Sequence, residues 1–352
     1  MKELASELKK YRNVFIVCDR KVEGFARSLD FARDDKGTRD DRRAILPITA
    51  DEAHKNIGTV MDICQWLMVN GADRDALVLA AGGGVTTDMA GFAASIYKRG
   101  IRYANVPTTL LSMVDAGIGG KTGVNLDGFK NLLGVIRQPE FTAIFPEVLE
   151  TLPERELRSG LAEMLKTFII KNPAHAYERT VDLFRNPVRP ASCGPQASPS
   201  FFTEGELPEL IRLAAGIKQD IVEKDEFETR LRRKLNLGHT WGHAIEWWQR
   251  ESGNAGTGEP FTHGEAVAIG MVQAARFAEK LGFAEEEGLS ARIKADLEAC
   301  GLPTELPCQA KDLLPAILND KKMQNGKINL VLPVRIGKVI IRKVASEIIA
   351  GA

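Results

Sequence analysis

Residues 77–131 decide the fold, and they read LVLAAGGGVTTDMAGFAASIYKRGIRYANVPTTLLSMVDAGIGGKTGVNLDGFKN. Residues 77–81 form a short apolar run bounded by glycine, which is typical of a buried parallel strand. The glycines at 82–84 end that run, and without a Cβ they let backbone N–H groups approach an anion closely. The next segment, residues 88–98, has helical spacing, and a helix N-terminus favours phosphate. We therefore expect a diphosphate group to bind at this turn, although a glycine triplet can also be no more than a tight turn.

A second strand and a cationic, glycine-rich segment follow. Residues 101–106 read as the strand, and Pro107-Thr108-Thr109 ends it with two hydroxyls. After Asp115 come four side chains that can bind an anion, Lys121, Asn125, Lys130 and Asn131. Lysines on a glycine-rich loop bring point charges close to oxyanions at no steric cost, so this loop predicts a phosphorylated, acidic substrate. The alternative is a solvated surface loop, where most lysines lie.

The residues before this stretch predict the same architecture. Residues 13–18 and 44–47 read as strands, and residues 51–69 as a helix. Strands and helices that alternate through about the first 140 residues are typical of an open parallel sheet, which binds ligands at the carboxyl ends of its strands. Glu52 and Lys55 lie at helical spacing near the start of that helix, where they either face a nucleotide or pair with each other.

The pattern changes near residue 149, where apolar residues begin to recur at helical intervals. We therefore expect an α/β domain with a parallel sheet at residues 1–148 and a mainly α-helical domain at residues 149–352. Residues 186–208 are rich in Pro, Ser and Gly, which predicts an insertion loop. The end of the chain, NLVLPVRIGKVIIRKV, alternates like a hairpin or a pair of edge strands. Further helices are expected at residues 209–223, 238–249, 264–281 and 286–299.

The composition excludes several classes of protein. The 47 basic and 47 acidic side chains cancel, so no net charge favours nucleic acid or an anionic membrane. No apolar stretch approaches the roughly 20 residues that span a bilayer, and the start of the chain lacks a signal-peptide layout. The five cysteines are widely spaced, which indicates neither a disulfide framework nor a thiolate metal site. We expect a cytoplasmic enzyme.

Histidines indicate a metal site in the second half of the chain. Three of the five, His239, His243 and His263, fall within a short stretch. His239 and His243 are four residues apart, so on a helix they share one face, and either could bind a metal ion. His263 opens the segment HGEAVAIGM, which suits a helix that starts at a cleft. A lone histidine is more often a satisfied core residue, but three together favour function.

A catalytic zinc ion usually takes three protein ligands from His and Asp or Glu, so an acidic ligand is also needed. Glu163 lies on an otherwise apolar helical stretch, where a carboxylate is costly unless it is paired or bound to metal. Lys166, one turn later, is an alternative partner for it. Rival acidic ligands that spacing alone does not exclude are Asp225, Glu226 and Glu265.

Several motifs occur in one order and together resemble the 3-dehydroquinate synthase family of the shikimate pathway. They are GGGVTTD, YKRG, PTTLL, VDAGIGGKTGVN, KN, TLPERE, GLAEMLK, LNLGHTWGHAIE, HGEAVAIGM and DKK, within residues 50–335. The resemblance implies an N-terminal, NAD-binding Rossmann-like domain, a helical C-terminal metal-binding domain and an active site in the cleft between them. It also implies NAD and zinc, or cobalt in its place, as cofactors, a phosphorylated keto acid as substrate, and a homodimer that binds neither nucleic acid nor membrane.

The resemblance also implies roles for individual residues. Zinc is expected at Glu163, His239 and His263, and His243 becomes a proton-relay or substrate-binding residue. Arg99 is expected to reach the active site of the neighbouring subunit. NAD is expected at Asp51, Glu52, Lys55, Gly83, Gly84, Val85, Asp88, Thr108, Thr109, Lys121, Lys130 and Thr151. The other catalytic and substrate-binding positions are Asp115, Lys121, Lys130, Asn131, Lys166, Lys218, Arg232, Asn236 and Lys322.

The reaction of this family explains why such residues are needed. Its substrate is 3-deoxy-arabino-heptulosonate 7-phosphate. NAD takes a hydride from the C5 alcohol, phosphate leaves by elimination, the hydride returns, and ring opening followed by an intramolecular aldol closure gives 3-dehydroquinate. Zinc polarises the oxygen at the oxidised carbon, while lysines and an arginine stabilise anionic intermediates. Because NAD is regenerated, the net reaction is that of a lyase.

Some positions depart from the family pattern. Ala116-Gly117 stands where many relatives carry two serines, Phe145 where an aspartate is frequent, and Arg230 where a glycine is frequent, while residues 249–262 form an extra loop. The departures leave room for a sibling sugar phosphate cyclase, such as aminodehydroquinate, 2-deoxy-scyllo-inosose or 2-epi-5-epi-valiolone synthase. The intact positions Lys121, Arg232 and Asn236 favour a substrate with a carboxylate. Two further classes of protein compete with this reading: a metal-dependent polyol or glycerol-phosphate dehydrogenase, which would produce NADH, and a catalytically inactive binding module.

Overall fold

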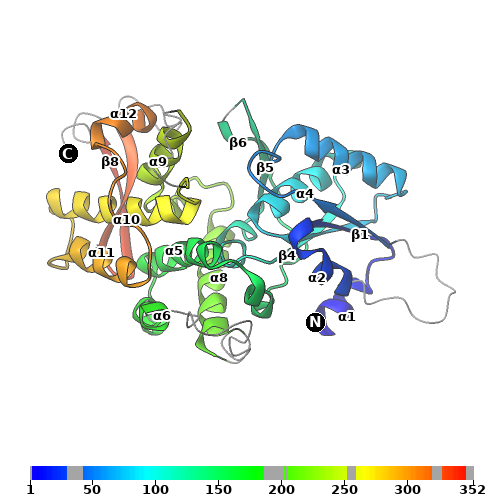
Figure 1. The fold of residues 1–352 in the computed structure, drawn as a ribbon, viewed down its shortest axis with the longest axis horizontal. Coiled ribbons are helices and arrows are strands. Elements are labelled where there is room, and N and C mark those ends of the chain that lie inside the picture. The colour runs from blue at the N-terminus through cyan, green and yellow to red at the C-terminus, as the bar shows by residue number, and fades with distance from the viewer. Residues whose placement is uncertain are drawn as a thin grey trace. The chain divides into compact units, whose positions relative to one another are not determined.

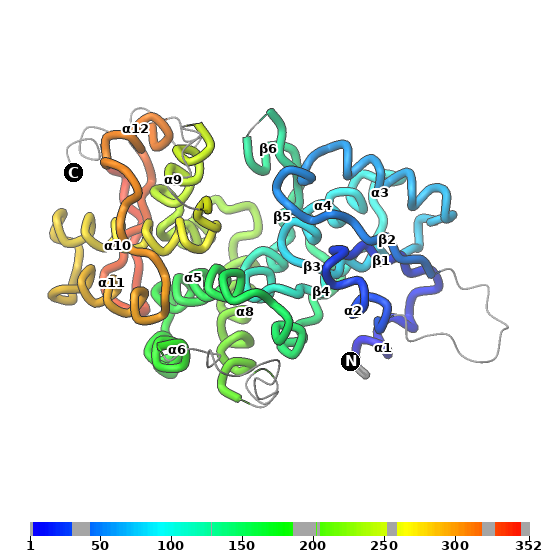
Figure 2. Tube along the Cα trace, in the orientation of Figure 1, coloured from blue at the N-terminus to red at the C-terminus, as the bar shows by residue number. Residues whose placement is uncertain are grey.

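The computed structural model forms two compact units, Met1–Leu152 and Pro153–Ala352. It describes residues 2–29, 43–127, 129–185, 202, 205–251, 259–318 and 327–345. Most of the expected insertion at 186–208, part of the extra loop at 249–262, and Lys322 lie outside these residues. Figure 1 labels the helices and strands, and Figure 2 traces the chain through them.

The N-terminal unit alternates strands and helices, as the sequence predicted. Four of its described strands form a parallel sheet in the order β2-β1-β3-β4. The elements of the unit are α1 (Lys2–Leu8), β1 (Val14–Asp19), η1 (Arg20–Val22), α2 (Glu23–Ser28), β2 (Arg43–Ile48), α3 (Ile57–Val69), β3 (Leu77–Gly82), α4 (Gly84–Ile96), η2 (Tyr97–Arg99), β4 (Arg102–Pro107), η3 (Ser112–Ala116), β5 (Lys121–Leu126), β6 (Phe129–Ile136) and η4 (Pro146–Thr151).

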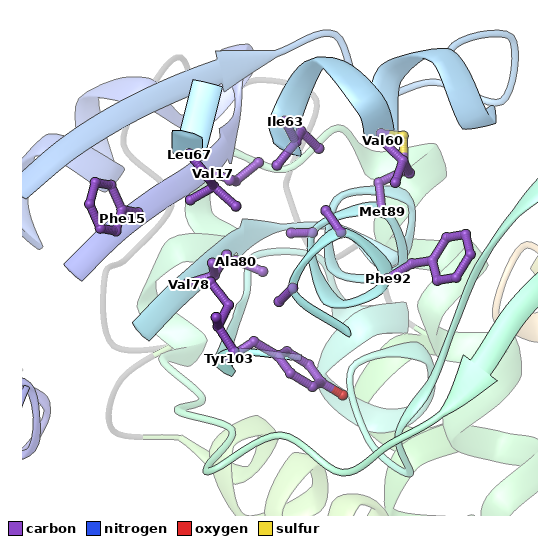
Figure 3. Close-up of a cluster of buried hydrophobic side chains, with 14 of the residues drawn as sticks. Phe15, Val17, Val60, Ile63, Leu67, Val78, Ala80, Met89, Phe92 and Tyr103 are labelled. Atoms are coloured by element: carbon purple, nitrogen blue, oxygen red, sulfur yellow. The ribbon is translucent and has the colours of Figure 1, made fainter. Parts of the chain in front are cut away.

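Both faces of the parallel sheet are covered by apolar side chains. On one face, Val17 and Val78 pack with Ile63 and Leu67 of α3 and with residues of α4 (Figure 3). On the other face, alternate residues of the same strands pack with α1 and α2. Successive side chains of a strand point to opposite faces, so a strand that is buried on both sides is apolar without interruption. This is why residues 77–81 read as an unbroken run.

The two helices that flank β3 begin at residues other than those expected. α4 begins at Gly84, directly after the glycine turn, and not near residue 88. α3 begins at Ile57, because Asn56 is its N-cap and accepts a hydrogen bond from the N–H of Thr59 at 3.1 Å. Residues 51–55 form a turn instead, in which Asp51 Oδ1 accepts from the N–H of His54 at 2.9 Å. Such side-chain bonds compete with helix formation.

The expectation of a glycine-rich loop after Asp115 was wrong, because β5 and β6 form an antiparallel hairpin there. Gly123 and Gly134 face each other across the two strands. A Cβ at Gly123 would lie 2.4 Å from the carbonyl oxygen of Leu133, and one at Gly134 would lie 2.2 Å from that of Thr122. Glycine is therefore needed at these positions for close approach of the strands.

The C-terminal unit is mainly helical, as expected. α8, α9, α10 and α11 match the predicted helices, and β7 pairs antiparallel with β8 in the predicted hairpin. The helices α6 and α12 were not predicted. The elements of the unit are α5 (Glu154–Ile170), η5 (Pro173–His175), α6 (Ala176–Arg185), α8 (Glu206–Lys224), η6 (Leu231–Asn236), α9 (His239–Glu251), α10 (His263–Lys280), α11 (Leu289–Ala299), α12 (Ala310–Leu318), β7 (Lys327–Arg335) and β8 (Lys338–Ala345).

α10 is the helix around which this unit packs, since it contacts α5, α9, α11 and β7 (Figure 1). Its contact with α9 is unusually close because glycines form it. A Cβ at Gly270 would lie 2.0 Å from the carbonyl oxygen of Gly238, and one at Gly242 would lie 3.3 Å from that of Ala266. The two helices that carry His239 and His263 are therefore held together through backbone contact.

No helix in the described part of the chain is long and apolar enough to cross a membrane. Cys18, Cys64, Cys300 and Cys308 are free, in agreement with the prediction that the cysteines form no disulfide framework. Cys193 lies outside the described residues.

Candidate active site

Three side chains from three helices converge in the C-terminal unit. Glu163 comes from α5, while His239 and His263 are the first residues of α9 and α10. Nε2 of His263 lies 3.4 Å from Oε1 of Glu163, and Nε2 of His239 lies 3.8 Å from the same oxygen. One ligand atom of each residue lies within 4.8 Å of the others. Among the described residues, this is the one group of three or more His, Cys, Asp or Glu side chains close enough to share a metal ion.

The second nitrogen of each imidazole is also engaged. Nδ1 of His239 lies 3.1 Å from the carbonyl oxygen of Leu237, and Nδ1 of His263 lies 3.1 Å from Oε1 of Glu246 on α9. A proton on Nδ1 satisfies both contacts and leaves the Nε2 lone pairs for a metal ion, an arrangement typical of histidine ligands. The orientation of the two rings is therefore compatible with metal binding through Nε2.

Glu163 is buried completely, and its two carboxylate oxygens accept no well-directed hydrogen bond from the described residues. The buried Lys166 forms an ion pair with Oε2, so Glu163 pairs with Lys166 and also faces the two histidines. Burial raises the pKa of Glu163, but Lys166 and His263 outweigh it and lower the pKa to about 2. A buried carboxylate with unused acceptor capacity, opposite two imidazole nitrogens, fits the donor set of a zinc or cobalt ion.

His263 lies between two carboxylates. Burial lowers its pKa, but Glu246 and Glu163 outweigh burial and raise the pKa to about 10. Without a metal ion the ring therefore holds a proton on each nitrogen at neutral pH, and an ion that binds Nε2 displaces one of them.

The rival carboxylates are used elsewhere. Glu265 accepts hydrogen bonds from Arg155 at 3.0 and 2.8 Å and closes a capping box with Thr262. Asp225 accepts backbone N–H groups at 2.7–2.9 Å from the loop that follows it. Neither of them, nor Glu226, belongs to the cluster around Glu163.

His243 lies beside the cluster without belonging to it. Its ring centroid is 5.2 Å from that of His239 and 6.3 Å from that of His263, and the side chain is exposed. Spacing left the choice between His239 and His243 open, and the geometry puts His239 in the cluster.

The C-terminal unit also buries three of the cations expected at the substrate. Lys166, Lys218 and Arg232 are only 1%, 6% and 2% exposed. Arg232 donates to the carbonyl oxygen of Glu226 at 2.5 Å. Lysine and arginine are rarely buried to this extent without a compensating anion or a functional reason.

In the N-terminal unit, residues expected at NAD gather around the carboxyl ends of β3 and β4. Gly83 is the N-cap of α4 and offers no side chain to the N–H groups of its first turn, which includes Val85. The N–H of Thr108 donates to the carbonyl oxygen of Gly82 at 2.9 Å, so Thr108 and Thr109 lie beside the glycine turn. A Cβ at Gly82 would lie 2.4 Å from Thr86 Oγ1, so packing alone already requires this glycine.

Glu52 and Lys55 do not pair with each other. Lys55 Nζ lies 2.6 Å from Asp88 Oδ2 in a largely buried ion pair, which ties the turn before α3 to α4. Glu52 Oε2 accepts from Asn125 Nδ2 at 2.8 Å. The structure therefore brings together Lys55 and Asp88, two of the residues expected at NAD, and links Glu52 to the hairpin.

The remaining expected residues of this unit are more dispersed. Asp115 lies in the π-helical turn η3, and Lys121, Lys130 and Asn131 lie on the hairpin. Asn131 has a φ of +51°, and its N–H donates to Asn125 Oδ1 at 2.9 Å. Asp51 instead binds His54, and Thr151 donates to the carbonyl oxygen of Val148, so these two residues are engaged within their own segments.

Family models match the two halves of the chain. The N-terminal domain model of 3-dehydroquinate synthase matches residues 45–159, and the C-terminal domain model matches residues 160–323. The chain belongs to the 3-dehydroquinate synthase family. It is 40% identical over 310 residues to the 3-dehydroquinate synthase of Dictyoglomus thermophilum, a match that covers 85% of this chain and 79% of the relative. It is also 40% identical over 300 residues to that of Picosynechococcus sp., with 84% and 76% covered.

Solved structures outside 3-dehydroquinate synthase itself share the fold. The 2-epi-5-epi-valiolone synthase of Streptomyces hygroscopicus subsp. jinggangensis, solved with NAD+ and Zn2+ bound, is 29% identical and superposes with a TM-score of 0.83 over 99% of this chain and 92% of its own. A probable glycerol dehydrogenase of Sinorhizobium meliloti, at 13% identity and a TM-score of 0.63 over 99% and 91% of the two chains, shares the fold alone.

The contact of Glu246 with His263, beside the candidate metal cluster, was not predicted from the sequence. Glu246 stands in the motif GHTWGHAIE, two helical turns after His239, so helical spacing from a candidate metal ligand is the signal that points to it. Replacing Glu246 with alanine is expected to weaken zinc binding roughly 10- to 100-fold, because His263 loses the acceptor that orients its ring. Competition with a chromophoric chelator measures this, and the control is Glu251→Ala, an exposed carboxylate on the same helix. Equal zinc affinity in the two variants would contradict the role of Glu246.

Proposed function

We propose that this chain is a 3-dehydroquinate synthase, which converts 3-deoxy-arabino-heptulosonate 7-phosphate into 3-dehydroquinate and phosphate. The observation that carries the proposal is the cluster of Glu163, His239 and His263 in a chain that matches the family in both halves. Relatives at 40% identity that bear this name support it. The reaction class is that of a phosphate-eliminating carbon–oxygen lyase.

Zinc, or cobalt in its place, is proposed to bind Glu163, His239 and His263, and NAD to bind the N-terminal unit. When bound, NAD would take a hydride from the substrate and return it, and the metal ion would polarise the oxygen of the oxidised carbon. Glu163 supplies one anionic ligand and the histidines supply two imidazole nitrogens, a set that in catalytic zinc sites leaves a position for the substrate.

The cations of the chain are proposed to hold the anionic groups of the substrate. Lys166, Lys218 and Arg232, with Asn236, would bind the carboxylate and hydroxyls, and their burial strengthens attraction to an anion because the surroundings are less polar than water. His243, beside the cluster, would relay a proton or bind substrate. Asp115, Lys121, Lys130, Asn131 and Lys322 complete the proposed set.

A homodimer is proposed in which Arg99 reaches the active site of the partner subunit. Arg99 is exposed and has a φ of +68°, directly after Lys98 with a φ of +49°. Such backbone at non-glycine residues costs on the order of 1 kcal/mol or more each, and strain of this kind is concentrated at functional sites. Phe129, Leu132 and Val135 expose apolar surface on β6, which a partner subunit would cover.

Replacing Asp88 with asparagine is expected to weaken NAD binding about tenfold, the loss of one charge-assisted hydrogen bond, because Lys55 loses the ion pair that ties it to α4. Titration with NAD, followed by tryptophan fluorescence, measures the affinity. Asp75→Asn is the matched control, since Asp75 is exposed and precedes β3 at its other end. If both variants bind NAD with the affinity of the parent chain, the proposed NAD-binding site is wrong.

The proposed function is tested by mixing the protein with NAD, zinc and the heptulosonate phosphate and following phosphate and NADH together. We expect one phosphate per substrate and no lasting NADH. Lasting NADH without phosphate would instead indicate a polyol dehydrogenase. The relationship to 2-epi-5-epi-valiolone synthase makes a sibling cyclase the second candidate, and it predicts turnover of a sugar phosphate that lacks the carboxylate.

A further inference from the structure

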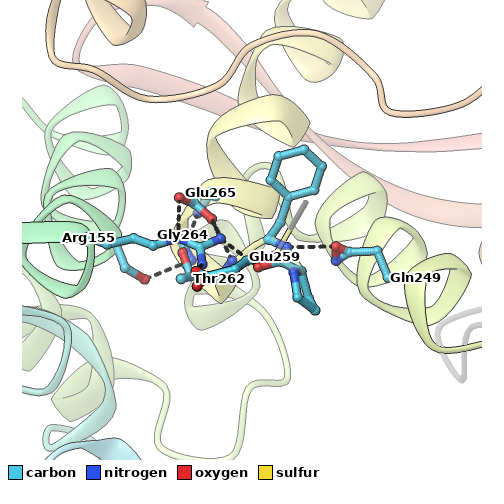
Figure 4. A network of polar contacts seen from close by, with 9 residues as sticks. Arg155, Gln249, Glu259, Thr262, Gly264 and Glu265 are labelled. Carbon is cyan, nitrogen blue, oxygen red and sulfur yellow. Dashed lines mark hydrogen bonds and ion pairs between the residues drawn. The ribbon is translucent and has the colours of Figure 1, made fainter. Parts of the chain in front are cut away.

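Arg155 belongs to the TLPERE motif and has no role in the proposed reaction, yet it binds the start of α10 through several groups (Figure 4). Its Nε and Nη2 donate to the two carboxylate oxygens of Glu265 at 3.0 and 2.8 Å, a bidentate pair. Nη1 donates to Glu259 at 2.5 Å, and Nη2 donates also to the carbonyl oxygen of Pro260 at 2.6 Å. One guanidinium therefore binds residues just before α10 and a residue in its first turn.

Three contacts in register join α5 to this start of α10. Arg155, Ser159 and Glu163 are each four residues apart, so they lie along one face of α5. Arg155 binds Glu265, Ser159 Oγ accepts from the N–H of Gly264 at 3.1 Å, and Glu163 faces His263 at 3.4 Å. Successive residues of α10 thus meet successive turns of α5, and the last of the three contacts lies within the metal cluster.

The contact at Gly264 leaves no room for adjustment. A Cβ at this position would lie 2.0 Å from the carbonyl oxygen of Ser159, so the two backbones touch. Gln249 of α9 fixes the other side of the entering chain, since its Oε1 accepts from the N–H of Phe261 at 2.8 Å (Figure 4). The first turn of a helix is otherwise prone to fray. His263, as the first residue of α10, is therefore held by contacts on both sides.

We propose that Arg155 is a positioning residue for the metal site, which sets the distance from His263 Nε2 to Glu163 before any ion binds. The inference rests on the proposed metal site. A bidentate arginine–carboxylate pair is stronger and more directional than a lysine pair, and Glu265, only 14% exposed at its side chain, is shielded from solvent.

The test compares Arg155→Met with Arg158→Met by zinc titration of the metal-free chain against a competing chelator. Arg158 is a matched control, because it lies on the same helix, is similarly exposed (41% against 37%) and pairs with Glu154 at 2.5 Å away from α10. We expect Arg155→Met to bind zinc about tenfold or more weakly, as for other residues that orient metal ligands, and Arg158→Met to be unchanged. The visible spectrum of the cobalt-loaded variant should also change, since it reports ligand geometry.

A merely stabilising role for Arg155 predicts a different result. Arg155→Met would then melt at a lower temperature, with and without zinc, but would keep the zinc affinity and cobalt spectrum of the parent chain, which would overturn the proposal. The double variant Arg155→Met/Glu265→Gln keeps the test decisive if one variant folds poorly. Arg155 and Glu265 form one ion pair, and either substitution already removes it. The double variant should therefore bind zinc no more weakly than Arg155→Met alone. These titrations need no substrate, so their failure is distinct from failure of the proposed phosphate release.

Discussion

Replacing His263 with alanine is expected to reduce phosphate release by a factor of roughly 1,000 or more, because a catalytic metal ion supplies several kcal/mol of transition-state stabilisation. His263 is one of three residues in the cluster, and its side chain is 32% exposed, so its removal should leave the fold intact. Phosphate release at saturating substrate, NAD and zinc measures the effect, and bound zinc is determined on the same sample.

The control is His175→Ala, since His175 lies in the same unit with its side chain 87% exposed and outside the cluster. It should retain the activity and the zinc content of the parent chain. Full activity of His263→Ala without added metal would refute the metal assignment.

Replacing Gly270 with alanine is expected to lower the free energy of unfolding by about 1–3 kcal/mol or more, the range for overpacking in a core. The new Cβ would lie 2.0 Å from the carbonyl oxygen of Gly238 and 3.1 Å from the nitrogen of Gly242. Both are backbone atoms, so no change of rotamer relieves the collision, and α9 and α10 must separate. Because these helices carry His239 and His263, zinc affinity should fall as well.

Urea unfolding measures the loss of stability, with Gly216→Ala as the matched control. Gly216 also lies within a helix, α8, but a Cβ there would meet nothing within 4 Å. This variant should be unchanged or more stable by about 0.5–1 kcal/mol, because alanine favours helix. Equal effects of the two substitutions would show that the glycine contact between α9 and α10 is unimportant.

Local sequence patterns predicted those elements whose residues all lie in similar, apolar surroundings. Residues 77–81 are buried on both sides of the sheet, so their unbroken apolar run identified β3 directly. Glu163 was identified as a candidate ligand for a related reason, since a single carboxylate in an otherwise apolar helical stretch needs a partner. In both cases the surroundings of each residue follow from its own element.

Element boundaries were less predictable. Asn56, three residues before Thr59, is the N-cap that moves the start of α3 to Ile57, and this cap was available in the sequence. The β5–β6 hairpin was hidden because glycines that allow two strands to approach resemble glycines of a loop. The pairing of Gly123 with Gly134 across the strands is what distinguishes the hairpin from a loop.

Contacts between distant residues could not be read from spacing. Glu246 and Arg155 were both present in motifs, but their roles depend on how α9 and α5 meet the start of α10. The same holds for Lys55, whose partner Asp88 lies on another helix. Such pairs form through tertiary packing, which cannot be inferred from the sequence around either residue.

The proposed reaction differs from a dehydrogenation in that the hydride taken by NAD returns to the substrate, and deuterium placed at C5 of the heptulosonate phosphate shows where that hydride ends. With NAD supplied far below the substrate concentration, we expect full conversion, one phosphate per product, and deuterium retained in the 3-dehydroquinate. Deuterium that accumulates in reduced NAD, with conversion that stops when NAD is used up and no phosphate released, would show that the hydride is not returned and that the chain is a dehydrogenase.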